Sequence, residues 1–269
     1  MDAPAISMPI LGVFRRIVRG YFRRHFHGVR VSAASRFVHD GTPLIVYANH
    51  SSWWDPMVGF LLAERLMPQR SHYAPMDAEA LARYGVLRKV GIFPVEMKTP
   101  KGAVQFLRTG TAILERGGVL WVTPQGRFVD ARTRPLIFKP GLAALAARVS
   151  AASGGCTVLP LAIEYPFWDE RLPEALLRFG EPVHILAGEI AESLQTRLID
   201  ALATTMDELR EIALRRDAGA LTTLSQGRLG VGGFYGIGKK LKAIVLRQPY
   251  REEHTVAENG SVEREGDNA

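Results

Sequence analysis

The residues best suited to chemistry lie in the segment 49–56, which reads NHSSWWDP. In this segment Asp55 follows His50 by five positions. A carboxylate that holds one imidazole nitrogen fixes the tautomer and leaves the other nitrogen free as a general base. The spacing therefore predicts a His–Asp pair, provided that the intervening loop folds the two side chains together.

The same segment is also typical of the start of a helix. Asp55 directly before Pro56 fits an N-cap residue followed by proline at the first helical position. This alternative explains Asp55 and Pro56 but gives no role to Asn49 and His50. On the residues alone, both interpretations stay open.

The elements around this segment indicate how it is positioned. The apolar run TPLIVYAN at 42–49 predicts a buried strand that ends just before His50, and residues 55–66 predict a helix. Strands are also predicted at 90–97, 119–124, 156–165 and within 174–185, and helices at 101–118, 141–153 and, with possible breaks, 188–217. This alternation favours an α/β fold: a single domain with a largely parallel central sheet flanked by helices. His50 then lies at the carboxyl edge of the sheet, where such folds bind ligands.

The first 30 residues predict a basic amphipathic helix that associates with a membrane. Its apolar stripe consists of Ile10, Phe14, Ile17, Val18, Tyr21 and Phe22, and five arginines fill much of the remainder. An aromatic stripe beside a dense arginine face is typical of a helix lying on an anionic bilayer. The alternative is a surface helix that packs its stripe on the domain, and both can hold at once.

The predicted organisation continues with a core domain at 31–217, a basic glycine-rich extension at 218–254 and a disordered tail at 255–269. The net charge of +7 favours anionic partners. The single cysteine, Cys156, excludes an intramolecular disulfide. No run approaches the roughly 20 apolar residues of a membrane span, and the N-terminus does not read as a signal peptide.

Five blocks occur in the order and approximate spacing of one enzyme family. They are NHSSWWDP at 49–56, GIFPVEMK at 91–98, VTPQGRF at 122–128, FKPG at 138–141 and VLPLAI at 158–163. Each block alone is weak, whereas five in order are specific. On these blocks the chain resembles the glycerolipid acyltransferases, which share a His-x-x-x-x-Asp motif and include lysophosphatidic acid and glycerol-3-phosphate acyltransferases.

The resemblance implies an O-acyltransferase of phospholipid biosynthesis, in the EC 2.3.1 class. It would move a fatty acyl group from acyl-CoA or acyl carrier protein to a hydroxyl of a lysophospholipid-like acceptor, with His50 as general base oriented by Asp55. The residues agree, because a hydroxyl needs a base and the sequence has no GxSxG nucleophile motif. No metal-ligand spacing is present, so we expect no metal and no cofactor beyond the acyl donor.

The family's substrate-binding positions are altered. Where the family has a glutamate that helps to hold the acceptor phosphate, this chain has Gln125, and Arg127 directly follows Gly126 instead of being one residue further on. The second block lacks the family's arginine but offers Lys98, and the fourth block contributes Lys139. We expect these five residues to bind substrate. The changes put a lysophosphatidic acid acceptor in doubt and make a glycolipid or carotenoid glycoside an alternative.

Other functions remain to be separated. A nucleic-acid binder is suggested by charge alone, and no nucleic-acid-binding motif supports it. A non-catalytic lipid-binding relative would not need both His50 and Asp55, and a hydrolase would use the same pair on water. Trp53 and Trp54 suit an interfacial anchor, a substrate entrance or the core. Together the observations favour a peripheral membrane enzyme on the cytoplasmic face, with a membrane lipid surface, an acyl donor and a lipid acceptor as partners.

Overall fold

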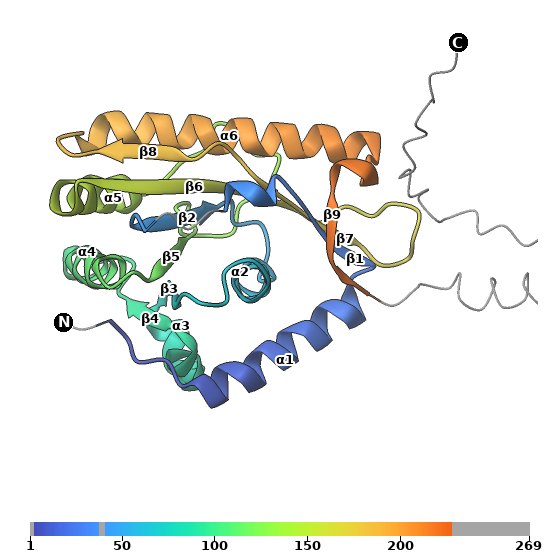
Figure 1. Cartoon of the computed structure of the whole chain (residues 1–269), viewed down its shortest axis with the longest axis horizontal. Helices are drawn as coiled ribbons and strands as arrows, with labels where there is room; N and C mark the ends of the chain where they lie inside the picture. Colours follow the sequence, from blue (N-terminus) through green and yellow to red (C-terminus); the bar gives the residue numbers. More distant parts are fainter. Residues whose placement is uncertain (1–2, 38–40, 228–269) are drawn as a thin grey trace, which may run out of the picture.

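The computed structural model describes residues 3–37 and 41–227, and Figure 1 shows their arrangement around one central sheet. The predicted disordered tail, 255–269, and the larger part of the predicted basic extension lie outside the described residues. No helix among the described residues is long and apolar enough to cross a membrane.

The sheet is mixed and mostly parallel, as the sequence predicts. Its strands run in the order β4-β3-β5-β2-β6-β7-β1-β9, and β8 pairs with β6. Only the pairs β1–β9, β6–β7 and β6–β8 are antiparallel. The strand bounds are β1 Gly28–Ser32, β2 Leu44–Ala48, β3 His72–Asp77, β4 Ile92–Val95, β5 Val119–Val122, β6 Gly155–Glu164, β7 Glu174–Phe179, β8 Val183–Leu186 and β9 Thr222–Gln226.

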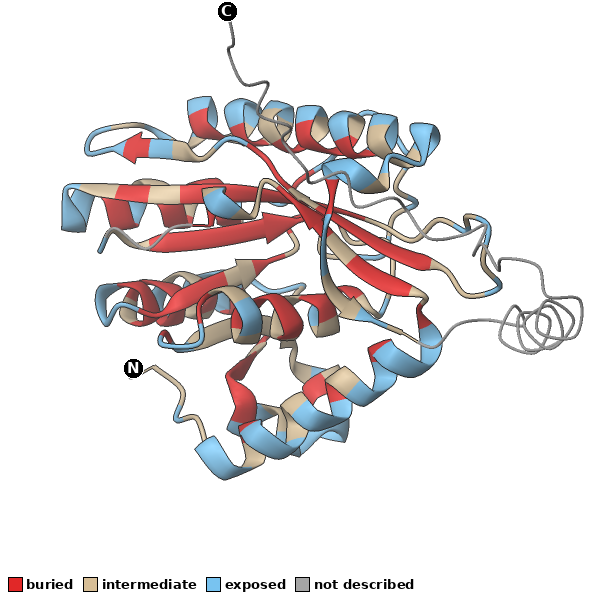
Figure 2. Ribbon diagram, turned by 45° about the vertical axis from the view of Figure 1, so that its right-hand side comes forward, coloured by how far each residue is buried: buried red, intermediate tan, exposed pale blue. Residues whose placement is uncertain are grey.

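The central strands are buried on both faces, and Figure 2 shows them almost wholly in the colour of buried residues. Every residue of β2 is buried between its parallel neighbours β5 and β6. Continuous apolar runs are expected of parallel strands covered on both sides. This strand therefore holds its carboxyl end, and the chain that follows it, in a fixed place.

Helices cover both faces of the sheet. Helices α1 (Met8–His25) and α2 (Asp55–Leu66) pack into one hydrophobic cluster, and α4 (Pro100–Glu115), α5 (Gly141–Ser153) and α6 (Ala191–Arg215) pack into another. Figure 1 shows α1 and α6 on opposite sides of the molecule. The remaining helices are α3 (Ala78–Arg83) and the short 3-10 turns η1 (Ala34–Arg36), η2 (Gly85–Val90) and η3 (Ala218–Ala220).

The apolar stripe expected on the N-terminal helix divides into two faces. Val18 and Phe22 are almost fully buried against the domain, whereas Ile17 and Tyr21 are 49% and 43% exposed. The helix therefore has side chains for packing on the domain and other side chains that are available for a membrane surface. One face packs on the core, and an adjacent apolar face with arginines beside it stays open to solvent.

Several elements differ from those that the sequence predicts. The single strand expected within 174–185 is two strands, β7 and β8, because the pairing with β6 is interrupted at residues 180–182 and resumes with a shift of one residue. The last helix, for which the sequence allowed breaks, has none, since α6 runs unbroken for 25 residues. Strand β9, within the stretch predicted as an extension, adds to the sheet edge at β1.

Candidate active site

The edge of the sheet that carries the site is held by Asn49, the residue after β2. Its side-chain amide donates to the carbonyl of Ile163 at 2.9 Å and accepts from the Ile163 amide at 2.8 Å. Asn49 is only 1% exposed. These paired bonds tie the end of β2 to the end of β6, so the backbone that leads into His50 has a fixed position.

The loop after Asn49 brings His50 and Asp55 into contact. Nδ1 of His50 lies 2.8 Å from Oδ2 of Asp55. The same carboxylate oxygen accepts from the Ser52 amide at 2.9 Å, and Oδ1 accepts from the Tyr165 hydroxyl at 2.7 Å. Because all three groups donate to one buried carboxylate, the imidazole is held in one orientation.

This geometry decides between the two interpretations of the segment. Helix α2 begins at Asp55 itself, and the N-cap position falls on Trp54, which makes no side-chain capping bond. The interpretation of Asp55 as a simple N-cap is therefore wrong, since its carboxylate serves the imidazole, the loop and Tyr165. A carboxylate only accepts, so Nδ1 of His50 carries the proton and Nε2 presents a lone pair.

Tyr165 is a site residue that the sequence did not predict. Burial, together with the negative charge of Asp55 and the hydrogen bond to it, raises the pKa of Tyr165 well above its usual range. The hydroxyl therefore stays a donor to Asp55 at neutral pH. Its position at the end of the strand that pairs with β2 is a usable signal, because both strands end at one edge.

The loop after β5 holds His50 from the other side. Gln125 is buried, and its Oε1 accepts a hydrogen bond from the His50 amide at 2.8 Å. The Val129 amide donates to the His50 carbonyl at 2.8 Å. The exposed ring of Phe128 lies beside the imidazole, with ring centroids 4.4 Å apart. Backbone and side chain of His50 are thus both restrained by this loop.

Gly126 and Lys139 also meet in this loop. Gly126 has a positive φ of +63°, and a Cβ atom placed there would lie 2.7 Å from Cε of Lys139. The Lys139 amide donates to the Pro124 carbonyl at 2.8 Å, and Nζ lies 3.4 Å from the carbonyl of Met97. Glycine is favoured here by the positive φ, whereas the flexible end of the lysine side chain could move away from a Cβ atom. Lys139 therefore links the third block to the residue that precedes Lys98.

Three of the expected substrate-binding side chains carry positive charges without acidic partners. Lys98, Arg127 and Lys139 are exposed, and within residues 3–37 and 41–227 none of them forms an ion pair. Neighbouring cations are paired, as in Arg132–Asp130, Arg134–Asp207 and Lys101–Glu96. The unpaired cations, which follow β4 and β5, are suited to a phosphate.

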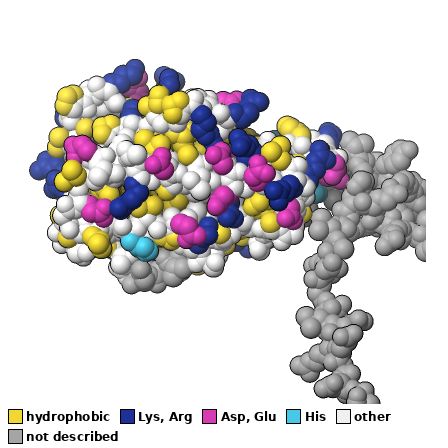
Figure 3. Space-filling model, turned by 90° about the horizontal axis from the view of Figure 1, so that it is seen from above, with side chains coloured by type: hydrophobic (Ala, Val, Ile, Leu, Met, Phe, Trp, Pro, Cys, Tyr) yellow, Lys and Arg dark blue, Asp and Glu magenta, His cyan; other side chains and the backbone are white. Residues whose placement is uncertain are grey.

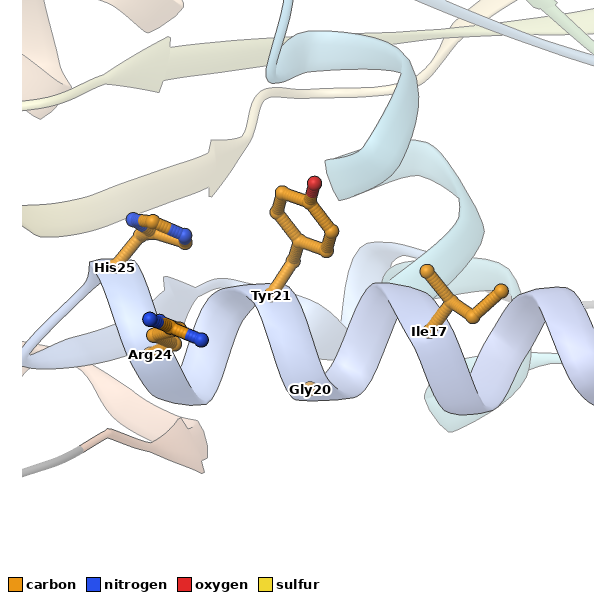
Figure 4. Close-up of a pocket in the computed structure, with 5 residues that line it drawn as sticks. All are labelled: Ile17, Gly20, Tyr21, Arg24 and His25. Atoms are coloured by element: carbon orange, nitrogen blue, oxygen red, sulfur yellow. The ribbon is translucent and has the colours of Figure 1, made fainter.

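A groove beside the loop 49–54, which carries His50, runs along the exposed side of α1. Figure 4 shows Ile17, Tyr21, Arg24 and His25 projecting from the helix around Gly20, which adds no side chain. Tyr21 packs edge-on against Trp53 and Trp54 of the loop, with ring centroids 6.4 and 6.0 Å apart. Trp53 is stacked on Trp54 and is 55% exposed. The loop 49–54 therefore contributes an aromatic ring to the open face of α1.

Metal ligation has no obvious site in the part of the chain that the structure describes, where no group of three His, Cys, Asp or Glu residues is suitably placed. The groups that can act chemically are the imidazole, its carboxylate and the unpaired cations. They fit a reaction in which a base takes a proton beside an anionic substrate group.

Comparison with known proteins identifies the family. The model of the Acyltransferase family matches residues 25–164, just over half of the chain, and this stretch contains His50, Asp55, Gln125 and Lys139. The chain belongs to the Acyltransferase family. A search of curated proteins found no match. Family membership implies that this acyltransferase is a transferase.

A solved structure supports the fold of this acyltransferase. The crystal structure of PlsC, the 1-acyl-sn-glycerophosphate (LPA) acyltransferase from Thermotoga maritima, superposes with a TM-score of 0.53. The match covers 76% of this chain and 79% of PlsC at 18% sequence identity. At that identity the likeness concerns the fold, so substrates have to be argued from the residues of the acyltransferase itself.

Proposed function

We propose that this acyltransferase moves a fatty acyl group from acyl-CoA or acyl carrier protein to a hydroxyl of a lysophospholipid-like acceptor. The observation that carries the proposal is the His50–Asp55 pair. Its carboxylate is buried and triply hydrogen-bonded, and Nε2 of His50 has no partner among the described residues. A base so oriented and left free on one side is suited to activating a hydroxyl.

The chemistry follows from that arrangement. Nε2 takes the proton of the acceptor hydroxyl as its oxygen attacks the thioester carbonyl carbon. The C–S bond then breaks, and the departing thiolate receives the proton from the imidazolium. Asp55 stabilises the imidazolium between the two steps. Cys156 takes no part, because burial raises the pKa of its thiol to about 12 and it lies at the opposite end of β6.

Lys98, Arg127 and Lys139 supply the binding of an anionic group. Their charges are uncompensated, and they follow strands that end at the same edge as β2. The phosphates of coenzyme A and the phosphate of a lysophospholipid both fit such a site. Gln125 and Gly126 shape it from the backbone side.

A second candidate acceptor is a glycolipid, such as a carotenoid glycoside. The observation that favours it is the third block itself, where Gln125 replaces a carboxylate and contacts His50 instead of Arg127. Arg127 is then held by no side chain in the described part of the molecule, so a sugar hydroxyl is an alternative ligand for this loop.

We further propose that the enzyme works at an anionic membrane surface through α1 and Trp53, as a peripheral protein on the cytoplasmic face. Exposed apolar side chains are accompanied there by Arg16, Arg23 and Arg24, which pair with no acid among the described residues. The face above α6 differs, because Figure 3 shows both signs of charge interspersed on it. An apolar stripe flanked by arginines suits an anionic bilayer.

The deciding experiment is a competition among acceptors. Purified protein would receive acyl-CoA or acyl carrier protein with lysophosphatidic acid, uncharged lyso-lipids and a glycolipid at equal concentrations, and products would be identified by mass spectrometry. Acylated lysophospholipid as the main product supports the first candidate, and acylated glycolipid supports the second. Free fatty acid formed equally with and without acceptors would mean a hydrolase, and the absence of any product would refute catalysis.

A further inference from the structure

Gln125 connects the loop after β5 to the catalytic histidine in a way that fixes the direction of its amide. The His50 N–H is a donor, so the atom 2.8 Å from it must be Oε1 of Gln125. The NH₂ group of Gln125 then points away from the His50 amide, and the only hydrogen bond of this side chain to the described residues is the one that its oxygen accepts. The side chain thus has a structural end, the oxygen bonded to the His50 amide, and a free end, the NH₂ group.

The structural end matters because the His50 amide is part of a restrained unit. The same loop grips the His50 carbonyl through the Val129 amide and the imidazole through Phe128. Gln125 is 7% exposed, so little water reaches the bond that it accepts. Loss of that acceptor would leave a donor unpaired directly beside the catalytic base.

The free end matters because of charge. The Nζ atom of Lys139 would lie 3.0 Å from a Cβ atom on Gly126, the residue next to Gln125. Lys98 and Arg127 are the other unpaired cations of this edge. A carboxylate in place of the Gln125 amide would also accept from the His50 amide, but it would add a negative charge to the loop that carries Arg127 and is bonded to Lys139 through the Pro124 carbonyl. The neutral amide leaves their charge to a ligand.

We propose that Gln125 is the positioning residue of His50, and that its neutrality keeps Lys98, Arg127 and Lys139 available to a phosphate group of the substrate. The inference rests on the proposed function for its kinetic part only. Gln125 combines two properties: it accepts a hydrogen bond from the His50 amide, and it carries no negative charge. Two near-isosteric substitutions change one property each.

Gln125→Met removes the acceptor and adds no charge, whereas Gln125→Glu keeps the acceptor and adds a charge. We expect Gln125→Met to lower kcat about 10- to 100-fold, since small displacements of a catalytic group have effects of that size. Gln125→Glu should restore most of kcat but raise KM for the phosphate-bearing substrate about three- to tenfold, from one added charge at short range.

Four substrates show whether the cations bind a phosphate of the acyl donor or the phosphate of the acceptor. Acyl-CoA is compared with acyl-pantetheine, which lacks the nucleotide phosphates, and lysophosphatidic acid is compared with monoacylglycerol. If Gln125→Glu raises KM only for acyl-CoA, the cations bind the donor, and if only for lysophosphatidic acid, they bind the acceptor. Unchanged KM values in all four arms overturn the charge part of the proposal.

Hydrogen exchange of the His50 amide tests the positioning part without any activity. In Gln125→Met this amide should exchange about tenfold faster or more, and in Gln125→Glu it should stay as protected as in the wild type. Equal protection in all three proteins, or a kcat in Gln125→Glu as low as in Gln125→Met, overturns the positioning role. If Gln125→Met does not fold, Gln125→Glu alone decides, because the proposal requires retained kcat and retained protection. If the wild-type protein transfers no acyl group, the proposed function is refuted. The hydrogen-exchange result still tests whether Gln125 positions His50, because it does not depend on activity.

Discussion

Replacement of Asp55 by asparagine separates the charge of this residue from its shape. An asparagine oxygen can accept from both the His50 imidazole and the Ser52 amide, while its NH₂ group donates to the Tyr165 oxygen, which can also act as an acceptor. The three contacts therefore survive in altered form, but the negative charge that stabilises the imidazolium is lost. We expect the rate to fall about 10²- to 10⁴-fold, with a loss of stability of about 1 kcal/mol or less.

Asp55→Ala gives the contrasting result. It leaves the His50 imidazole, the Ser52 amide and the Tyr165 hydroxyl without their shared acceptor, at about 1–3 kcal/mol for each buried group that stays unpaired. At about 2–4 °C per kcal/mol for a protein of this size, the melting temperature should fall by about 6 °C or more. Asp55→Asn should shift it by only a few degrees.

Asp77→Asn is the matched control for helix capping, because Asp77 is a true N-cap that accepts from the amides of Glu79 and Ala80 and forms no hydrogen bond with His50 or Asp55. It should change stability slightly and turnover not at all. Turnover and thermal melting of the three variants are measured on the same preparations. An Asp55→Asn protein with near-normal turnover would refute the role of the carboxylate in catalysis, whatever its melting temperature.

The remaining predictions concern the base, the membrane face and a buried histidine. His50→Ala should lower turnover by about 10²- to 10⁴-fold with a nearly normal melting curve, and turnover near that of the wild type would exclude His50 as the base. Arg23→Glu should weaken sedimentation with anionic vesicles at low salt, whereas Arg215→Glu on α6 should not, and equal effects would argue against a bilayer contact through α1. Burial lowers the pKa of His72 to about 4, although its hydrogen bond to the Met67 carbonyl opposes the shift. The unfolded chain takes up this proton near pH 6.5 and the folded chain only near pH 4, so stability should fall by about 3 kcal/mol as pH drops through that window. Urea unfolding at pH 7 and pH 4.5 measures this, and His72→Gln should show a flatter pH dependence.

Much of the fold was predictable because the central strands are buried on both faces. Such strands appear as plain apolar runs, and Leu44–Ala48 and Val119–Val122 were located on that basis. Two of the missed strands, β3 and β9, lack this signal. No residue of β3 (His72–Asp77) is fully buried, and β9 (Thr222–Gln226) is a polar edge strand whose register is set by β1. Their pairing comes from tertiary contacts rather than from local hydrophobicity.

The structure also changes the experiment suited to the N-terminal helix. A deletion of residues 1–30 looks informative if the helix is a separate membrane anchor. Val18 and Phe22 are nearly fully buried, and residues 28–30 belong to β1, so the deletion would remove part of the core and of the sheet. Loss of vesicle binding after deletion would then report unfolding. Charge reversal on the exposed face avoids this, because it leaves the buried face intact.

The contact between His50 and Asp55 was predictable from spacing, whereas the groups that hold the pair were not. Tyr165 and Gln125 lie 110 and 75 residues from the side chain or amide that each one contacts. Such contacts depend on which strands become neighbours, and no local pattern gives the strand order. The resemblance to the glycerolipid acyltransferases assigned Gln125 to the substrate, and the structure shows that its oxygen is already engaged by His50.

That engagement alters how the replacement of glutamate by glutamine is understood. From the sequence, a neutral amide holds a neighbouring arginine less firmly than a carboxylate and so weakens a phosphate site. In the structure Gln125 accepts from the His50 amide, and Lys98, Arg127 and Lys139 form no ion pair with a carboxylate among the described residues. The same substitution that loosens an arginine thus also leaves more positive charge for an anion, and these effects oppose each other. Whether lysophosphatidic acid or an uncharged lipid is the better acceptor therefore depends on which effect is larger, and the KM values of Gln125→Glu for the two acceptors measure that difference directly.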